Sequence, residues 1–263
     1  MSMRDIKRRI KSVRNIRQIT KAMGLVSATK VQRAKKMFED TRTFFSELKF
    51  VAENFPGGIY SATCDKQCVV MISSDRGLCG SYNINIVNFS LNIVRSQKEN
   101  ILISLGNCGT EIAKRKGVVA RKNFSYNLDD ESINKIAEVL TDYYKNGYEI
   151  CLAYTKFYSA MRCAPMKKKI LPLNKIKSEF IFEPDPKSVS DHFVRKYVSM
   201  SILNGLIESS LCEQNSRMLS MNAATDNAES IISELNLKYN RLRQNQITQE
   251  LTEIISGAEA LKN

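Results

Sequence analysis

Apolar residues recur at spacings of three and four along the first fifth of the chain, as in an amphipathic helix. The stripe comprises Ile6, Ile10, Val13, Ile16, Met23, Val26, Val31, Ala34, Met37, Phe38, Phe45, Leu48 and Val51. It stops at Asn54-Phe55-Pro56-Gly57-Gly58, where proline and glycine end helices. We predict one helix over residues 1–55, about 75 Å long at 1.5 Å per residue.

The last third of the chain shows the same periodicity over a longer segment, residues 187–263, which contains no proline. Its stripe first comprises Phe193, Tyr197, Met200, Leu203, Ile207 and Leu211. A polar patch, Glu213-Gln214-Asn215-Ser216-Arg217, interrupts it. The stripe then resumes with Leu219, Ala223, Ala228, Ile231, Leu235, Tyr239, Leu242, Ile247, Leu251, Ile254 and Ile255. We predict a second long helix here.

Neither helix can bury its apolar stripe by itself, and no internal repeat supplies a partner. Pairing of the two as an antiparallel coiled coil buries both stripes. A compact helical bundle is the alternative, but it needs breaks that these segments do not contain.

The middle of the chain, residues 64–183, has a different pattern. Short apolar runs at 68–73, 101–106 and 148–155 have the length of buried strands, and helical segments near 81–98, 108–116 and 131–146 lie between or beside them. A last strand over 167–173 is expected at the sheet edge. Alternation of strands and helices indicates parallel βαβ units. The predicted fold class is therefore an α/β protein in which a Rossmann-like domain is inserted between two coiled-coil helices.

Charge is concentrated at one end. The chain has a formal net charge of +13. Residues 1–36 hold twelve Lys and Arg but one acid, Asp5, so this segment carries +11 and the remainder +2. Such a segment suits nucleic acid, anionic lipid or an acidic protein surface. Because residues 1–37 contain no aromatic side chain for base stacking, an acidic protein explains the charge as well as nucleic acid does.

Several chemistries are excluded or disfavoured by composition. The single histidine, His192, rules out sites built on pairs of histidines and disfavours a His-based triad. Seven scattered cysteines without a C-x-x-C motif indicate reduced thiols rather than a disulfide framework or a metal site. No apolar run reaches the roughly 20 residues of a membrane-spanning helix. We expect no metal and no cofactor.

A glycine-containing loop follows the first predicted strand. It reads Ser73-Ser74-Asp75-Arg76-Gly77-Leu78-Cys79-Gly80, and its candidate site residues are Asp75, Arg76, Gly77 and Gly80. The loop matches neither the P-loop nor the dinucleotide-binding motif. It fits either a phosphate site or a tight turn that needs glycine for backbone reasons.

Three segments in this order give the chain a resemblance to a known family, the gamma subunits of F-type ATP synthases. They are Ile6 to Val13 with Ile19-Thr20-Lys21-Ala22-Met23, then Ser74 to Gly80, and then Ala223 to Ala228 with Tyr239-Asn240 and Ile247 to Leu251. The chain departs from the family where many relatives have His instead of Gln214 and a longer side chain instead of Gly24.

The resemblance implies a rotor. It implies partners in three alpha and three beta subunits of a catalytic head, an epsilon subunit and the c-ring of the membrane sector, with no direct nucleotide binding and no catalysis by this chain. It implies a peripheral position on the cytoplasmic face of a bacterial inner membrane, since the matching motif leaves no room for a transit peptide. Carried over by motif, the coupling or partner-contact residues are Lys21, Met23, Arg217, Gln244, Thr248 and Glu250.

Two other functions remain open from the residues alone. One is a nucleic-acid-binding protein that uses the basic helix, and the other is a small α/β nucleotide-binding enzyme with helical extensions.

Overall fold

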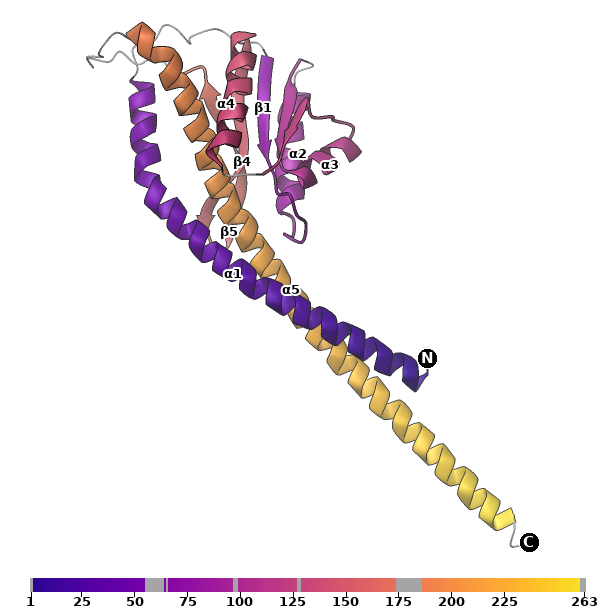
Figure 1. Cartoon of the computed structure of the whole chain (residues 1–263). Helices are drawn as coiled ribbons and strands as arrows, with labels where there is room; N and C mark the ends of the chain where they lie inside the picture. The colour runs from indigo at the N-terminus through magenta and orange to yellow at the C-terminus, as the bar shows by residue number, and fades with distance from the viewer. Residues whose placement is uncertain are drawn as a thin grey trace. The chain divides into compact units, whose positions relative to one another are not determined.

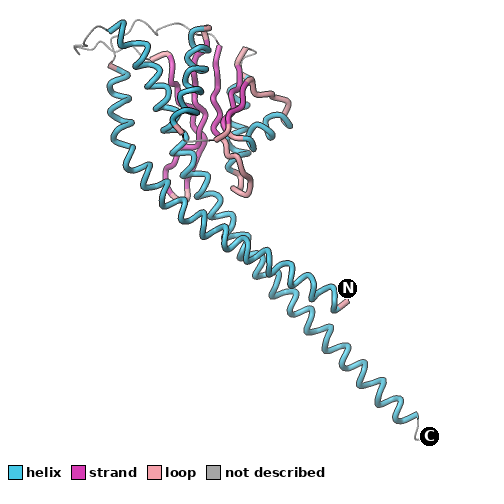
Figure 2. Tube along the Cα trace, in the orientation of Figure 1, coloured by secondary structure: helices cyan, strands magenta, loops and turns pink. Residues whose placement is uncertain are grey.

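The described residues form two long helices, a mixed sheet and three shorter helices (Figure 1, Figure 2). The computed structural model describes residues 2–54, 64, 66–96, 99–126, 129–173 and 186–260, with side chains from 192 to 257 in the last range. The long helices are α1 (Met3–Glu53) and α5 (Pro186–Ala260). The chain divides into two compact units, Met1–Val26 with Met218–Asn263, and Ser27–Arg217.

The larger unit, Ser27–Arg217, is built on a five-stranded sheet in the order β3-β2-β1-β4-β5. Its strands are β1 (Lys66–Ile72), β2 (Ile101–Leu105), β3 (Lys122–Phe124), β4 (Tyr148–Ser159) and β5 (Arg162–Leu171). The pairs β1–β2, β1–β4 and β2–β3 are parallel, and the hairpin β4–β5 is antiparallel. The connecting helices are α2 (Tyr82–Arg95), α3 (Asn107–Arg115) and α4 (Asp130–Lys145).

Both faces of the sheet are covered, which explains why the central strands are continuous apolar runs. Because side chains alternate along a strand, Cys68, Val70 and Ile72 of β1 pack with α4 and α5, whereas Val69 and Met71 pack with α2 and α3. The Asp129 side chain accepts the Ser132 N–H at 3.0 Å and so caps α4.

Within the larger unit, α5 is buried on more than one side. Val194, Val198, Ile202 and Leu206 join the core of the sheet, and Ile207 and Leu211 of the predicted stripe are buried as well. This burial is wider than the single stripe predicted from sequence. A Cβ atom at Gly205 would lie 2.5 Å from Leu152 Cδ2 on β4, so a larger residue would require the Leu152 side chain to move.

The smaller unit pairs the first part of α1 with the last part of α5 in antiparallel fashion. Thr20 Oγ1 lies 2.8 Å from Thr225 Oγ1, and Arg17 forms an ion pair with Glu229. Further toward the N-terminus, Ile6 packs with Leu235. Since rising numbers in α1 meet falling numbers in α5, the helices run in opposite directions.

Burial along α1 follows a strict seven-residue repeat, the 3.5-residue period of a coiled coil. The positions of this repeat, which we call the seam, are buried or half-buried: 3, 6, 10, 13, 17, 20, 24, 27, 31, 34, 38, 41, 45, 48 and 52. Outside the repeat, only positions 23, 28, 53 and 54 of the described residues 2–54 are half-buried. Four residues that were predicted to lie in the stripe are instead 39–58% exposed: Ile16, Val26, Met37 and Val51. The polar or small residues Arg17, Thr20 and Gly24 occupy the seam in their place.

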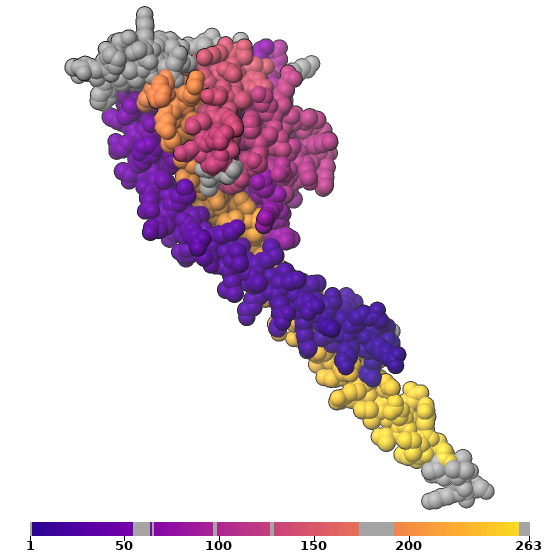
Figure 3. All heavy atoms as spheres, in the orientation of Figure 1, coloured from indigo at the N-terminus to yellow at the C-terminus, as the bar shows by residue number. Residues whose placement is uncertain are grey.

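The seam of α5 in the smaller unit comprises Met221, Thr225, Ala228, Ile232, Leu235, Tyr239 and Leu242. Continuation of the repeat would place polar residues, Gln246 and Gln249, in the seam. The predicted stripe members Ile247, Leu251, Ile254 and Ile255 are exposed instead, as are the earlier predicted members Leu219, Ala223 and Ile231. In Figure 3 the yellow end of α5 extends beyond the indigo end of α1. We call residues 243–257 of α5 the exposed terminal segment.

The predicted fold class is confirmed: two long terminal helices pair in antiparallel fashion, and a mainly parallel sheet with its helices is inserted between them in sequence. β3 was not predicted, and β5 begins five residues earlier than expected. The domain boundaries 1–55, 64–183 and 187–263 stay predictions, and parts of them lie outside the described residues. None of the described helices has an apolar stretch that could span a bilayer.

Candidate functional site

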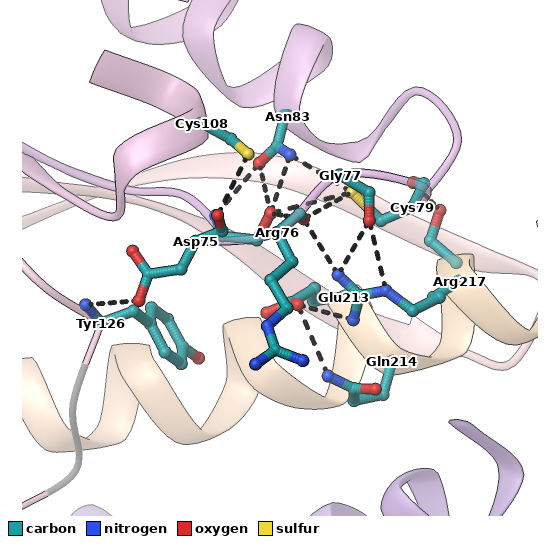
Figure 4. Close-up of polar contacts among 12 residues, drawn as sticks. Asp75, Arg76, Gly77, Cys79, Asn83, Cys108, Tyr126, Glu213, Gln214 and Arg217 are labelled. Carbon is teal, nitrogen blue, oxygen red and sulfur yellow. Dashed lines mark hydrogen bonds and ion pairs between the residues drawn. The ribbon is translucent and has the colours of Figure 1, made fainter. Parts of the chain in front are cut away.

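The glycine-containing loop and the polar patch of α5, which sequence treated separately, meet in the larger unit (Figure 4). We call loop residues 73–81 together with α5 residues 213–217 the loop–helix clamp. The loop leaves the carboxyl end of β1, the end at which open α/β sheets usually bind their ligands. In this chain, α5 occupies that position at the loop.

Arg217 is the centre of the clamp. Its Nη2 donates to the carbonyl oxygens of Arg76 at 3.0 Å and Gly77 at 3.3 Å, and its Nη1 lies 2.7 Å from Glu213 Oε1. Ser216 Oγ adds a hydrogen bond of 2.7 Å to the Cys79 carbonyl. The loop therefore presents carbonyl oxygens to a guanidinium, whereas a phosphate-binding loop presents N–H groups to an anion.

Arg217 and Glu213 are both more than nine-tenths buried. Burial raises the pKa of the Glu213 carboxyl, and the adjacent Arg217 guanidinium opposes that shift, as does Lys30. A buried pair of this kind is costly to break, because the remaining charge is left without its counter-ion. The clamp thus fixes the loop on α5 through groups that depend on one another.

The Asp75 carboxylate secures the other side of the loop. Its Oδ1 accepts the Asn107 N–H at 2.9 Å and its Oδ2 accepts the Tyr126 N–H at 3.1 Å. The next two N–H groups of α3, from Cys108 and Gly109, donate to Ser74 O and Ser73 Oγ. The start of α3, where a phosphate could bind, is therefore occupied by the chain's own loop.

The tip of the loop contains an unusual backbone. Leu78 has φ of +62°, in the left-handed region that costs a non-glycine residue roughly 1–2 kcal/mol. Its side chain is 62% exposed. Gly80, with φ of +58°, adopts a similar conformation without that cost. Gly80 thus serves the geometry of a tight turn, whereas Gly77 has neither a positive φ nor a neighbour within 4 Å that would require glycine. The conformation at Gly80 favours a turn over a phosphate site.

Cys79 is a structural thiol. It is buried, and its sulfur accepts from Asn83 Nδ2 at 3.2 Å. His192 is exposed. Among the residues that the structure describes, no group of three or more His, Cys, Asp and Glu side chains could hold a metal ion.

The other predicted site residues lie in the smaller unit. Lys21 is exposed and Met23 half-buried on α1. Gln244, Thr248 and Glu250 are exposed in the terminal segment of α5. Thr248 Oγ1 donates to the Gln244 carbonyl at 2.9 Å, so the two residues share one helix face. Asp75, Arg76 and Gly77 lie together with Arg217 in the clamp.

Sequence reasoning missed the partners that hold the clamp: Glu213, Ser216, Asn83 and Tyr126. Two of them belong to the polar patch in the apolar stripe of α5. Polar residues at positions where periodicity predicts burial are the signal that could have identified them, since a buried polar group needs a hydrogen-bond partner.

Known proteins are similar to this chain in sequence over almost its entire length. A family model described as "ATP synthase" matches residues 2–261. The ATP synthase gamma chain of Clostridium botulinum (strain Eklund 17B / Type B) is 39% identical over 276 residues, which cover 98% of each chain. The gamma chain of Clostridium perfringens (strain SM101 / Type A) is 35% identical over 278 residues, again 98% of each.

Solved structures share the fold. A chain of the Euglena gracilis mitochondrial ATP synthase (OSCP/F1/c-ring, rotational state 3) aligns with a TM-score of 0.78 at 17% identity, over 98% of this chain and 94% of that chain. A chain of the Tetrahymena thermophila mitochondrial ATP synthase (central stalk/c-ring) gives 0.67 at 24% identity, over 78% and 99%.

Proposed function

The chain belongs to the family of ATP synthase gamma chains, and from that premise we propose that it is the central rotor subunit of a bacterial F-type ATP synthase. In this role it performs no catalysis. It transmits rotation from an ion-driven c-ring to a head of three alpha and three beta subunits, where nucleotide is bound and converted. The observation that carries the proposal is the 39% identity over 98% of both chains.

The exposed terminal segment of α5 suits the end of a rotor that is seated in partner subunits. Ile247, Leu251 and Ile254 recur at spacings of four and three, and each is 46–68% exposed. An exposed apolar stripe of this kind is typical of an interaction surface. We assign the contact with the alpha and beta subunits to this segment, and its polar residues Gln244, Thr248 and Glu250 to the same surface.

The basic N-terminal part of α1 suits the same surroundings. Residues 1–36 carry +11, and an acidic sleeve of partner protein would complement this charge. Lys21, which is exposed, and Met23, which is half-buried, would contribute to that contact. Arg217 differs, because it is buried within the clamp. We infer that it acts on coupling by holding loop 73–81 rather than by direct contact with a partner.

The remaining assignments follow from the same premise. Epsilon and the c-ring are the proposed partners on the membrane side. The chain would be a peripheral protein on the cytoplasmic face of the inner membrane, attached through those partners and bound to no cofactor or nucleotide of its own.

Co-expression with the alpha and beta subunits of its own genome tests the proposal. We expect a stable complex whose steady ATP hydrolysis requires this chain. Replacement of Leu251, Ile254 and Ile255 by Gln should reduce hydrolysis, because it removes the apolar stripe without shortening the helix. Gln246→Ala with Gln249→Ala, on the same exposed segment, is the matched control and should have little effect.

A complex that hydrolyses ATP equally well without the chain would contradict the proposal. Hydrolysis by the chain alone would also contradict it. Salt-sensitive binding of the purified chain to DNA or RNA, in preference to the alpha and beta subunits, would favour the nucleic-acid function instead.

A further inference from the structure

A groove in the larger unit, separate from the clamp, lies between α1 and the β4–β5 hairpin. Its volume is about 560 Å³, within the range of roughly 300–1,000 Å³ for small-molecule sites. Five cations line it: Lys35, Arg42 and Lys49 from α1, Lys156 from β4 and Lys168 from β5. Its carboxylates are Glu39 and Glu208, so the lining carries a net charge of +3.

The positions of the cations follow from the secondary structure. Lys35, Arg42 and Lys49 are seven residues apart, so they lie on one face of α1 over about 21 Å. Phe38 and Phe45 alternate with them and are half-buried. On the hairpin, Lys168 lies opposite Leu152 in the strand register. Lys156 is four residues after Leu152 on β4, so its side chain points to the same face as that of Leu152. Lys156 and Lys168 therefore share a sheet face.

These cations are poorly neutralised by the chain itself. Lys35 pairs with Glu39 at 3.8 Å and Lys49 with Glu53 at 3.5 Å, both exposed pairs of little energetic consequence. For Arg42 and Lys168, no carboxylate oxygen of the described residues lies within 4.0 Å. The groove therefore concentrates positive charge beside aromatic side chains.

Lys49 and Lys168 are the two cations of the groove that repel each other. Both line this groove and also an adjoining cavity of about 370 Å³. Burial lowers the pKa of Lys168, and repulsion from Lys49 lowers it further, although Glu208 and Glu53 oppose the shift. A multiply charged anion between the two ammonium groups would remove this repulsion.

We propose that this groove is a binding site for a phosphate-bearing polyanion, which Lys49, Lys168 and Arg42 hold by charge-assisted hydrogen bonds. The three-point spread of positive charge matches a chain of linked phosphates better than a single phosphate. Glu208 is not free to neutralise the lysines fully, because its Oε1 also accepts the Phe157 N–H at 3.0 Å. Nothing in the rotor function requires this site, so it goes beyond that function.

Isothermal titration of the full chain with sodium tripolyphosphate at low ionic strength tests the site. We expect one binding site, weakened about tenfold by Lys168→Gln and about tenfold by Lys49→Gln, as loss of one charge-assisted contact implies. Lys36→Gln is the matched control, because Lys36 is an exposed lysine on α1 that does not line the groove.

A second measurement separates a site from general attraction to a basic protein. Titration of the lysine side chains by NMR should show the pKa of Lys168 rising when tripolyphosphate binds, with no such change at Lys36. Absence of binding at millimolar tripolyphosphate would overturn the proposal. Equal weakening by Lys36→Gln, or tighter binding of hexaglutamate than of tripolyphosphate, would also overturn it.

Discussion

The guanidinium of Arg217 shows how one residue organises the larger unit. It contacts two loop carbonyls and the Glu213 carboxylate, and these groups are about 140 and four residues away in sequence. A buried charge without partners is strongly destabilising. The loop carbonyls and the Glu213 carboxylate provide the partners of the Arg217 guanidinium, and Arg217 in turn provides the counter-ion of Glu213. A substitution of Arg217 therefore also affects the groups that it contacts.

Arg217→Gln should destabilise the larger unit by about 3–5 kcal/mol, because it leaves Glu213 buried without its counter-ion. Arg217→Lys should lose less, since it keeps the charge but not the two-sided contact. Urea unfolding of the full chain measures both. Arg195→Gln is the matched control on the same helix; its pair with Glu138 is exposed, and a change under about 1 kcal/mol is expected.

Glu208 gives a pH-dependent prediction. Burial raises its pKa in the folded chain, although the Phe157 N–H, Lys156, Tyr154 and Lys168 oppose the shift. The protonated carboxyl is thus favoured by folding. Its contribution to stability is present below the unfolded pKa, about 4.3, and is lost as pH rises through the raised folded value.

Glu208→Gln should therefore gain stability relative to the parent chain as pH rises from 4 to 8, and the amide oxygen can still accept the Phe157 N–H. Unfolding midpoints in urea at several pH values check this. Parallel curves for the two chains would show that the carboxyl does not titrate differently in the folded state.

At the scale of elements, the seam of the helix pair is the least expected feature. Sequence reasoning followed the largest apolar side chains and so placed Ile16 and Val26 in the interface. The actual seam contains Arg17, Thr20, Gly24 and Ser27, because a seven-residue repeat is maintained through 51 residues of α1. A Cβ atom at Gly24 would lie 2.9 Å from Asn222 Oδ1, so the helices approach closely there.

The strands differ in how clearly their sequence predicts them. Apolar runs identified β1, β2 and β4, since strands buried on both faces have no polar alternation to confuse the pattern. β3 has three residues, two of them exposed, and carries no such signal. The clamp could not be predicted, because nothing local indicates that Arg217 meets Arg76 and Gly77; only the polar interruption of the stripe marked the place.

Two glycines of α5 give opposite predictions. Gly205→Ala should cost about 1–3 kcal/mol, because the added Cβ would lie 2.5 Å from Leu152 Cδ2 in a close-packed core. Gly257→Ala should stabilise the helix by about 0.5–1 kcal/mol, since nothing lies within 4 Å and alanine is the better helix former. Helix content and thermal unfolding of the two variants provide the comparison.

At the scale of the whole molecule, charge is distributed by segment rather than by fold. The first 36 residues carry +11 and the other residues +2. Both compact units contain part of this basic segment, since the boundary lies between Val26 and Ser27. Long-range attraction to an acidic partner therefore depends on residues 1–36 as a whole, in both units.

This distribution predicts an association rate that is sensitive to salt. Binding of the chain to its alpha and beta subunits should slow at least about tenfold between roughly 0.05 and 0.5 M NaCl, with a smaller change in dissociation. Replacement of Arg8, Arg9 and Lys11 by Gln should reduce that salt dependence. Stopped-flow measurements decide the point, and a rate independent of salt would exclude electrostatic steering.

The position of α5 at the carboxyl edge of the sheet also explains why the loop after β1 is closed to a diffusible ligand. At the edge where open α/β sheets usually bind ligands, this chain provides the guanidinium of Arg217, which its own helix holds against the Arg76 and Gly77 carbonyls. Val194, Val198, Ile202 and Leu206 of the same helix complete the hydrophobic core. The region between the long helices is therefore not an autonomous module. Without α5 it would lose both the Arg217 contacts and part of its hydrophobic core, and an added peptide spanning residues 192–217 should restore both.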